Sequence, residues 1–287
     1  MDKVLIADVA KKYTEYDLIR SNTDLPEFPN FRTELLFAFL RLSPSSVGHS
    51  ELFSLVTSLA QLGLDTHDLI PETNANNGRK EVYSRQLKVL AGDYFSSRFY
   101  QLLSQAGHIE VTNHLAAAIC EVNRLKMTLY TLMRQWKVTA DEYIQFTVHI
   151  RSQLYLTFTR LLEGVYSKKW PDILLGFTRC EIIYDEIRNL DANRGLNKGW
   201  AFWHILHNGT KEERKQLQSG DADPGKLRNL LLKYNVKAQL LQMLDVHFRQ
   251  LTDKIRQFDS DKLANELYRI GEPFLRYLSA PRAMEEG

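Results

Sequence analysis

The clearest candidate for chemistry in this chain is a group of acidic residues at the end of an expected helix. The segment Asp65-Thr66-His67-Asp68 follows an apolar stretch, and Glu72 comes shortly after it. At 100° per residue, Asp65, Asp68 and Glu72 fall within about 60° of arc if the helix persists that far. Carboxylates gathered at a helix end can hold Mg²⁺, which prefers oxygen ligands and usually shares them with phosphates. A solvated polar face explains the same three residues.

The element that must position these carboxylates is a helix over about residues 50–70. Its apolar residues recur at three- and four-residue spacing on one broad face, and the acidic residues lie on the other side. The apolar face comprises Leu52, Leu55, Val56, Leu59, Ala60, Leu62, Gly63 and Ile70.

A second helix is expected over about residues 84–105, and its apolar arc is unusually wide. Its apolar residues cover about 220°, whereas a helix that faces only its own core needs little more than about 100°. The surplus makes one side a candidate subunit interface, and a central position in a large bundle explains it equally. Arg98 lies within the arc, so its guanidinium must reach solvent or meet a carboxylate. The candidate interface residues are Leu87, Leu90, Tyr94, Phe95, Arg98, Phe99 and Leu102.

Composition limits the class of protein. The chain has 287 residues, of which 44% are hydrophobic and 25% charged, as in a globular protein with a sizeable core. The net charge is +2, and no long Lys/Arg block supports nucleic-acid binding. No apolar run reaches the roughly 20 residues of a membrane span, and the charged start does not resemble a signal peptide. We therefore expect a cytoplasmic protein, with Cys120 and Cys180 as buried free thiols.

Helical spacing runs through almost the whole sequence. We expect an all-α fold of roughly ten helices with no substantial sheet, since alternation of period two is hard to find. The breaks at Pro, Gly and Ser are short and evenly spread. Residues 1–287 are therefore predicted to form a single domain, with residues 1–30 as a peripheral N-terminal segment.

The order of these segments resembles the all-trans polyprenyl diphosphate synthases. In that family a helix ends in His-Asp-Asp-x-x-Asp, a loop carries Arg-Arg-Gly, and the next helix reads Leu-x-Gly-Asp-Tyr-Leu. Here His67-Asp68 and Leu90-Ala91-Gly92-Asp93-Tyr94 match, and Gly199-Trp200 to Glu213-Arg214 resembles a late helix and turn. The resemblance implies an isoprenoid-synthase-like bundle. In the family, carboxylates bind the Mg²⁺ ions that hold an allylic diphosphate.

The chemistry of that family is largely missing from the matching positions. In the first motif, Leu69 replaces the second Asp, and Glu72 stands where the last should be. The Arg pair that grips diphosphate reads Asn76-Asn77, although Arg79 and Lys80 follow. The second Asp-rich motif corresponds to Cys180–Arg188, with Tyr184 and Arg188 in place of metal-binding Asp residues. A family Lys-Thr pair is replaced around Ser152-Gln153.

Within this superfamily, the chain is most similar to the small subunit of two-component heptaprenyl or hexaprenyl diphosphate synthases. The segments that carry the similarity are Leu64–Asp68 and Arg85–Ser96. The resemblance implies a heterodimer in which the large subunit binds Mg²⁺ and the isoprenoid diphosphates. No cofactor, metal or catalytic residue is then expected in this chain. The small subunit is needed for activity and influences prenyl chain length, and the product supplies the menaquinone side chain.

Several residues keep two interpretations each. The acidic motif either keeps a vestigial metal site or intersubunit contact, or has only a structural or capping role. Its residues are Asp65, His67, Asp68 and Glu72. Gly63 stands where the family sets product length by side-chain bulk, and a close helix contact explains it as well. The aromatic set Trp200, Phe202 and Trp203 lines an isoprenoid groove or packs in the core. His204 and His207 share a helix face that permits metal binding, although no third ligand is evident.

We therefore expect the accessory subunit of a heterodimeric trans-polyprenyl diphosphate synthase. Two other functions remain open: a self-sufficient divergent prenyltransferase or terpene-synthase-like enzyme, and a non-enzymatic isoprenoid-binding helical protein.

Overall fold

The computed structural model describes residues 5–70, 78–192, 198–219 and 223–279. These residues form thirteen α-helices and two 3₁₀-helices, with no β-strand among them. The expected all-α class is confirmed. The helices outnumber the predicted ten because several are short, such as α2 (Asp17–Arg20). Within the same ranges, no helix combines the length and apolar character needed to cross a bilayer.

Backbone contacts divide the chain into two compact units. The first comprises Met1–Cys120 and Leu154–Trp170, and the second comprises Glu121–Gln153 and Pro171–Gly287. The division falls within three helices: α6 (Ile109–Arg134), α7 (Ala140–Leu156) and α8 (Gly164–Asp191).

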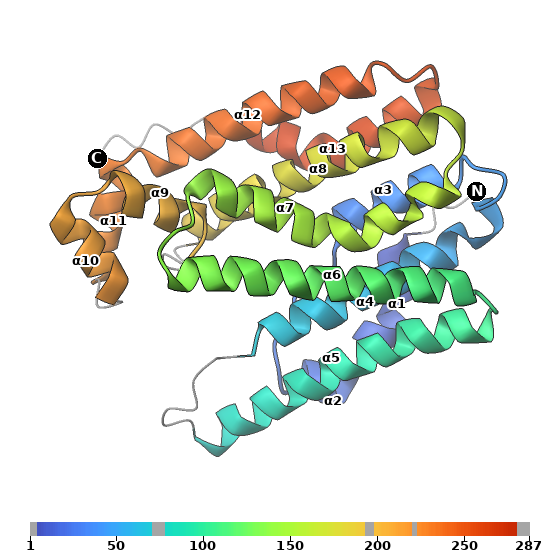
Figure 1. Cartoon of the computed structure of the whole chain (residues 1–287), viewed down its shortest axis with the longest axis horizontal. Coiled ribbons are helices and arrows are strands. Elements are labelled where there is room, and N and C mark those ends of the chain that lie inside the picture. Colours follow the sequence, from blue (N-terminus) through green and yellow to red (C-terminus); the bar gives the residue numbers. More distant parts are fainter. Residues whose placement is uncertain (1–4, 71–77, 193–197, 220–222, 280–287) are drawn as a thin grey trace. The chain divides into compact units, whose positions relative to one another are not determined.

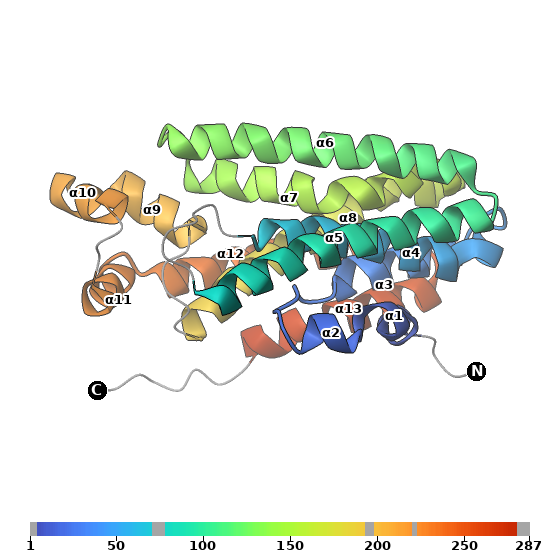
Figure 2. The ribbon, with the colours of Figure 1, turned by 90° about the horizontal axis from the view of Figure 1, so that it is seen from below.

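The first unit is built around α4. It contains α1 (Ile6–Thr14), α2, α3 (Asn30–Leu40), η1 (Val47–His49), α4 (Ser50–Asp68), α5 (Arg79–Gln105) and η2 (Thr157–Leu161). α1, α3 and α5 all contact α4, and α2 contacts α5 (Figures 1 and 2). Because of this enclosure, every residue from Phe53 to Leu64 is buried. Solvated polar side chains of α4 are therefore limited to its two ends, Glu51 in the first turn and the acidic residues of the last turn.

Two buried hydroxyls of α4 bond to carbonyl groups within the helix itself, whereas the buried Ser54 Oγ has no hydrogen-bond partner among the described residues. Thr57 Oγ1 donates to the Phe53 carbonyl at 2.7 Å, and Ser58 Oγ donates to the Leu55 carbonyl at 2.7 Å. Such bonds let polar side chains enter a core without external partners.

Large aromatic side chains form the rest of the first core. Phe39 lies 4.8 Å from Trp170, ring centre to ring centre, and the Trp170 indole donates to the Tyr155 carbonyl at 3.3 Å. The N-terminal segment contributes too, because α1 buries Ile6 and Ala10. Cys120 is exposed, so its predicted burial is wrong: it lies on an outward position of α6.

The second unit holds the remaining helices. They are α9 (Trp200–Asn208), α10 (Lys211–Ser219), α11 (Pro224–Lys233), α12 (Val236–Ile255) and α13 (Asp261–Ser279), together with parts of α6, α7 and α8. α12 and α13 pack as a pair (Figure 1). Phe274 meets Phe248 and Phe177, with ring centres 6.0 and 6.4 Å away. Cys180 is buried as predicted, and burial raises the pKa of its thiol to about 12.

Two helix starts in this unit have reciprocal caps that the sequence encodes locally. At α7, Glu142 N–H donates to Thr139 Oγ1 at 3.2 Å, and Thr139 N–H donates to the Glu142 carboxylate at 2.9 Å. At α10, Thr210 and Glu213 make the same pair of bonds, at 3.3 and 2.8 Å. Both are Thr-x-x-Glu capping boxes, which satisfy backbone donors of the first turn.

Candidate functional site

The acidic residues of the first motif lie on the last turn of α4. Asp65 is half-buried and accepts a hydrogen bond from Gln61 Nε2 at 2.8 Å, while Asp68 is exposed and ends the helix. Glu72 belongs to residues 71–77, which lie outside the described residues, as do Asn76 and Asn77. Within the described part of the chain, no three His, Cys, Asp or Glu side chains are grouped to hold a metal ion.

The two segments that carry the family resemblance meet where α4 crosses α5. His67 Nε2 lies 3.5 Å from Asp93 Oδ1. The imidazole rests on Gly92, where an added Cβ would come within 2.6 Å of the ring. One turn earlier, a Cβ on Gly63 would lie 2.7 Å from Ser96 Oγ and 3.1 Å from the Gly92 carbonyl oxygen. The missing side chains therefore allow the two helices to approach closely.

This geometry favours the packing interpretation of Gly63 over the chain-length interpretation. The residue faces the backbone of α5 and not an open channel, so its small size serves helix packing. The chain-length interpretation is not supported, because bulk added here would meet Ser96 and Gly92 first. His67 likewise has a packing partner, since its ring fills the space above Gly92.

At the second motif, cationic side chains stand beside the remaining carboxylate. Asp185 forms an ion pair with Arg151, with 2.7 Å between Oδ2 and the guanidinium nitrogen. Arg188 lies over the Tyr184 ring, 5.7 Å from its centre. The internal cation neutralises Asp185, and the charge of Arg188 opposes any metal ion placed nearby.

Sequence reasoning missed a further carboxyl in this motif, Glu186. Its carboxyl accepts hydrogen bonds from the backbone N–H groups of Trp200 and Ala201, at the start of α9. A Cβ on Gly199 would overlap the Glu186 oxygens. Desolvation raises the pKa of Glu186 to about 7, despite those hydrogen bonds and the nearby Arg151. The signal in the sequence was an acidic residue directly between Asp185 and the apolar Ile187, which is buried.

The aromatic set of α9 lies in the core of the second unit. Trp200, Phe202 and Trp203 are 3%, 5% and 0% exposed, which fits core packing and leaves no surface for an isoprenoid groove. The two histidines of α9 have separate partners. His204 stacks on Trp200 with ring centres 4.6 Å apart, and His207 Nδ1 lies 2.9 Å from the Trp203 carbonyl.

The candidate interface residues of α5 divide into buried and exposed members. Leu87, Phe95 and Phe99 are only 5%, 0% and 6% exposed, so these side chains do not lie on the surface where a docking role was predicted for them. They follow the four-residue spacing of one stripe, which faces the core of the chain's own first unit. Leu90 is 62% exposed and remains available, and Leu102 is half-buried.

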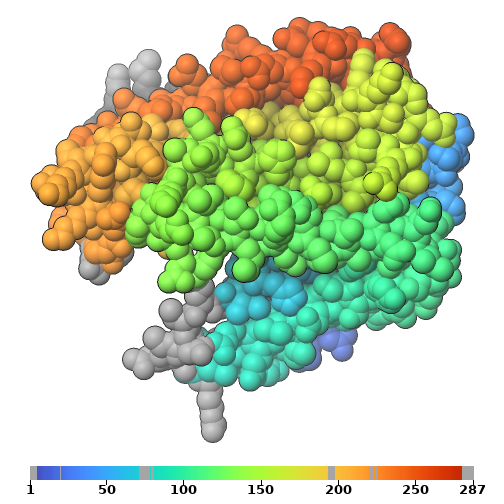
Figure 3. Space-filling view, in the orientation of Figure 1, coloured from blue at the N-terminus to red at the C-terminus, as the bar shows by residue number. Residues whose placement is uncertain are grey.

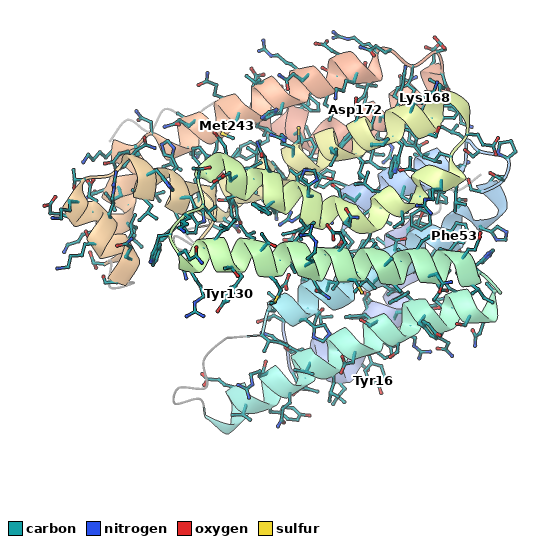
Figure 4. The ribbon with its side chains drawn as sticks, in the orientation of Figure 1. Tyr16, Phe53, Tyr130, Lys168, Asp172 and Met243 are labelled. Carbon is teal, nitrogen blue, oxygen red and sulfur yellow. The ribbon has the colours of Figure 1, made fainter. Side chains whose placement is uncertain are left out.

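The aromatic and cationic members of α5 are engaged with the N-terminal segment. Tyr94 stacks on Tyr16, which is labelled in Figure 4, with ring centres 6.3 Å apart. The Arg98 guanidinium lies 5.0 Å from the Tyr94 ring centre and 5.9 Å from that of Tyr13. It also donates to Gln101 Oε1 at 2.8 Å. The bond to Gln101 is exposed, so the guanidinium reaches solvent, one of the two expected outcomes, and it lies against aromatic rings on the way.

Comparison with known proteins identifies the family. A sequence model of the family described as heptaprenyl diphosphate synthase (HEPPP synthase) subunit 1 matches residues 16–221, more than half of the chain. The chain belongs to this family. Heptaprenyl diphosphate synthase component 1 from Geobacillus stearothermophilus is 36% identical over 72 residues, which are 25% of this chain and 30% of that protein. This match therefore spans less than a third of the relative's length.

Solved structures with the same fold are polyprenyl diphosphate synthases. Geranylgeranyl pyrophosphate synthase from Lactobacillus brevis has a TM-score of 0.71 at 13% identity, covering 96% of this chain and 91% of its own. Decaprenyl diphosphate synthase from Rhodobacter capsulatus has a TM-score of 0.64 at 15% identity, covering 95% and 98%. These identities are low, so the comparison establishes the isoprenoid-synthase fold.

The close packing where α4 crosses α5 predicts the effect of adding a side chain at Gly63. Gly63→Ala places a methyl group against Ser96 and Gly92, so we expect it to lower the free energy of unfolding by about 1–3 kcal/mol. Chemical denaturation monitored by circular dichroism measures this change. Without the clash, Ala in a helix would stabilise by roughly 0.5–1 kcal/mol relative to Gly.

Gly48→Ala is the matched control, because nothing lies within 4 Å of an added Cβ there. Ser96→Ala combined with Gly63→Ala should recover part of the loss by removing the nearest oxygen. If Gly63→Ala proved as harmless as Gly48→Ala, close packing at the crossing would be refuted.

Proposed function

We propose that this chain is the accessory subunit of a heterodimeric trans-polyprenyl diphosphate synthase of the heptaprenyl type. A large partner subunit binds Mg²⁺, the allylic diphosphate and isopentenyl diphosphate, and carries out the reaction. This chain is required for full activity and influences how far the prenyl product grows. The product is the precursor of the menaquinone side chain.

The observation that carries this proposal is the charge at the second motif. Departure of diphosphate requires several carboxylates to hold the metal ions that offset its charge. Here the positions of two such carboxylates hold Tyr184 and Arg188, and Asp185 is paired with Arg151. Catalysis by this chain alone would need a metal ion bound beside two guanidinium groups, against electrostatic repulsion.

Family membership supports the existence of a partner. The matching family is described as subunit 1, and the Geobacillus relative as component 1 of its synthase. On this proposal the chain keeps the synthase fold for assembly. Its effect on chain length acts through the surface it presents to the partner, since Gly63 faces α5.

A three-way activity assay tests the proposal. Farnesyl diphosphate, labelled isopentenyl diphosphate and Mg²⁺ are given to this chain, to a large subunit with both Asp-rich motifs from the same source, and to their mixture. We expect prenyl transfer at a substantial rate from the mixture only, with product length read by chromatography.

The other outcomes separate the alternatives. Mg²⁺-dependent turnover by this chain alone, abolished by a chelator, would identify a self-sufficient prenyltransferase. The large subunit alone could also be as active as the mixture and give the same product. That result would favour the alternative that this chain is a non-enzymatic isoprenoid-binding protein.

The docking surface we propose is the outward face of α5, which lies on the surface of the first unit (Figure 3). Its exposed apolar residues are Val82, Tyr83, Val89, Leu90 and Tyr100, with exposed fractions between 39% and 62%. They fall within about 120° of arc and extend along roughly 27 Å of helix. The polar residues Gln86, Asp93 and Ser97 lie between them on the same arc, so the face is mixed in character. Exposed apolar side chains gathered on one helix face are typical of a protein interaction surface. The occupant we assign is the large subunit.

Leu90→Glu tests this surface. The side chain is 62% exposed, so we expect an unchanged melting temperature for the isolated chain. A charge in the apolar contact should weaken the complex at least about tenfold in Kd. Analytical ultracentrifugation or calorimetric titration of the two subunits measures the affinity.

Leu232→Glu is the matched control, because Leu232 is 59% exposed on α11 in the other unit. It should change neither stability nor affinity. Equal affinities for the wild-type chain and Leu90→Glu would rule out docking through this face of α5.

A further inference from the structure

The contact between α8 and the start of α9 places an ionisable group at a helix end. The Glu186 carboxyl accepts from the N–H groups of Trp200 and Ala201, which belong to the first turn of α9 and have no partner within that helix. Gly199 lacks the side chain that would collide with the carboxyl oxygens. Gly199 also accepts the first hydrogen bond of α9, which Trp203 N–H donates to its carbonyl at 3.3 Å.

The surroundings of this carboxyl supply little charge to balance its own. From α7, Arg151 and Tyr143 face it; from α8, Asp185; and from α9, the two backbone donors. The charge of Arg151 is largely committed to Asp185, 2.7 Å away. Tyr143 stays neutral, because burial, and then the charge of Glu186, raise its pKa to about 12. Glu186 is half-buried, and an ionised Glu186 would thus be a partly desolvated charge with Asp185 as a like-charged neighbour.

We propose that Glu186 is a proton-controlled latch on the first turn of α9. When Glu186 is protonated, its neutral carboxyl accepts the hydrogen bonds from Trp200 and Ala201 without burying a charge, and the first turn of α9 is closed. When Glu186 is ionised, opening the first turn of α9 lets water solvate the carboxylate. Conformations with this turn open therefore become more populated. The chain therefore senses pH through the stability of the α8–α9 contact.

The sign of the effect follows from proton linkage. The pKa of Glu186 is about 7 in the closed structure, against an ordinary 4.5 when water reaches it. Between these values only the closed state keeps the proton, so closure weakens as the pH rises from 4.5 to 7 and then levels off. With these two constants, the opening equilibrium should increase about tenfold between pH 6 and pH 8.

Hydrogen exchange of the α9 backbone amides in the full chain tests the latch. Rates at pH 6 and pH 8, corrected for intrinsic exchange, should give the tenfold increase in opening. Glu186→Gln keeps an acceptor but cannot ionise, so its α9 amides should be protected equally at both pH values. Glu181→Gln, at a buried position on the same helix, should keep the wild-type pH dependence.

A direct titration keeps the proposal testable if Glu186→Gln does not fold. The ¹³C carboxyl resonance of Glu186 in the wild-type chain should titrate with a midpoint near 7. A midpoint near 4.5, unchanged opening between the two pH values, or the same pH dependence in Glu186→Gln would each overturn the latch. The experiment needs no partner subunit, so its result is independent of the proposed accessory role.

Discussion

The close approach of α4 and α5 at Gly63 and Gly92 is the contact on which the first unit depends. A Cβ at either position would overlap Ser96 or the His67 ring, so the distance between the two helices is set by the absence of side chains. That distance lets the Leu87, Phe95 and Phe99 stripe reach the core, where it is almost completely buried. Because α4 is enclosed along most of its length, a shift of α5 would disturb α1 and α3 as well.

The same contact explains how motif segments persist when their chemistry is lost. His67, Gly92 and Asp93 belong to segments that resemble a metal-binding synthase, yet here they contact one another. Packing needs shape and small volume, whereas metal binding needs several carboxylates of uncompensated charge. The two requirements are separable, so substitutions such as Leu69 and Arg188 can remove one and leave the other. The family match and the synthase fold are consistent with a chain that keeps the architecture.

Charge is handled differently at Asp185 and Glu186, two adjacent, half-buried carboxyls of the second motif. Asp185 has a guanidinium partner, and the ion pair balances its charge. Glu186, one residue along, has only backbone donors and lies against Gly199, where desolvation prevails. Neighbours on a helix point about 100° apart, so adjacent acids can face environments of opposite effect.

The helical class and the resemblance carried by Leu64–Asp68 and Arg85–Ser96 could be predicted from the sequence. These follow from local spacing and from short segments whose residue types are specific. Tertiary structure alone decided that Gly63 faces a helix, that Phe95 is core while Leu90 is surface, and that Arg151 neutralises Asp185. It also brought Glu186 to the start of α9. The physical reason is that helical periodicity gives the direction of a side chain around its own axis, whereas burial, pairing and pKa depend on which other element lies in that direction.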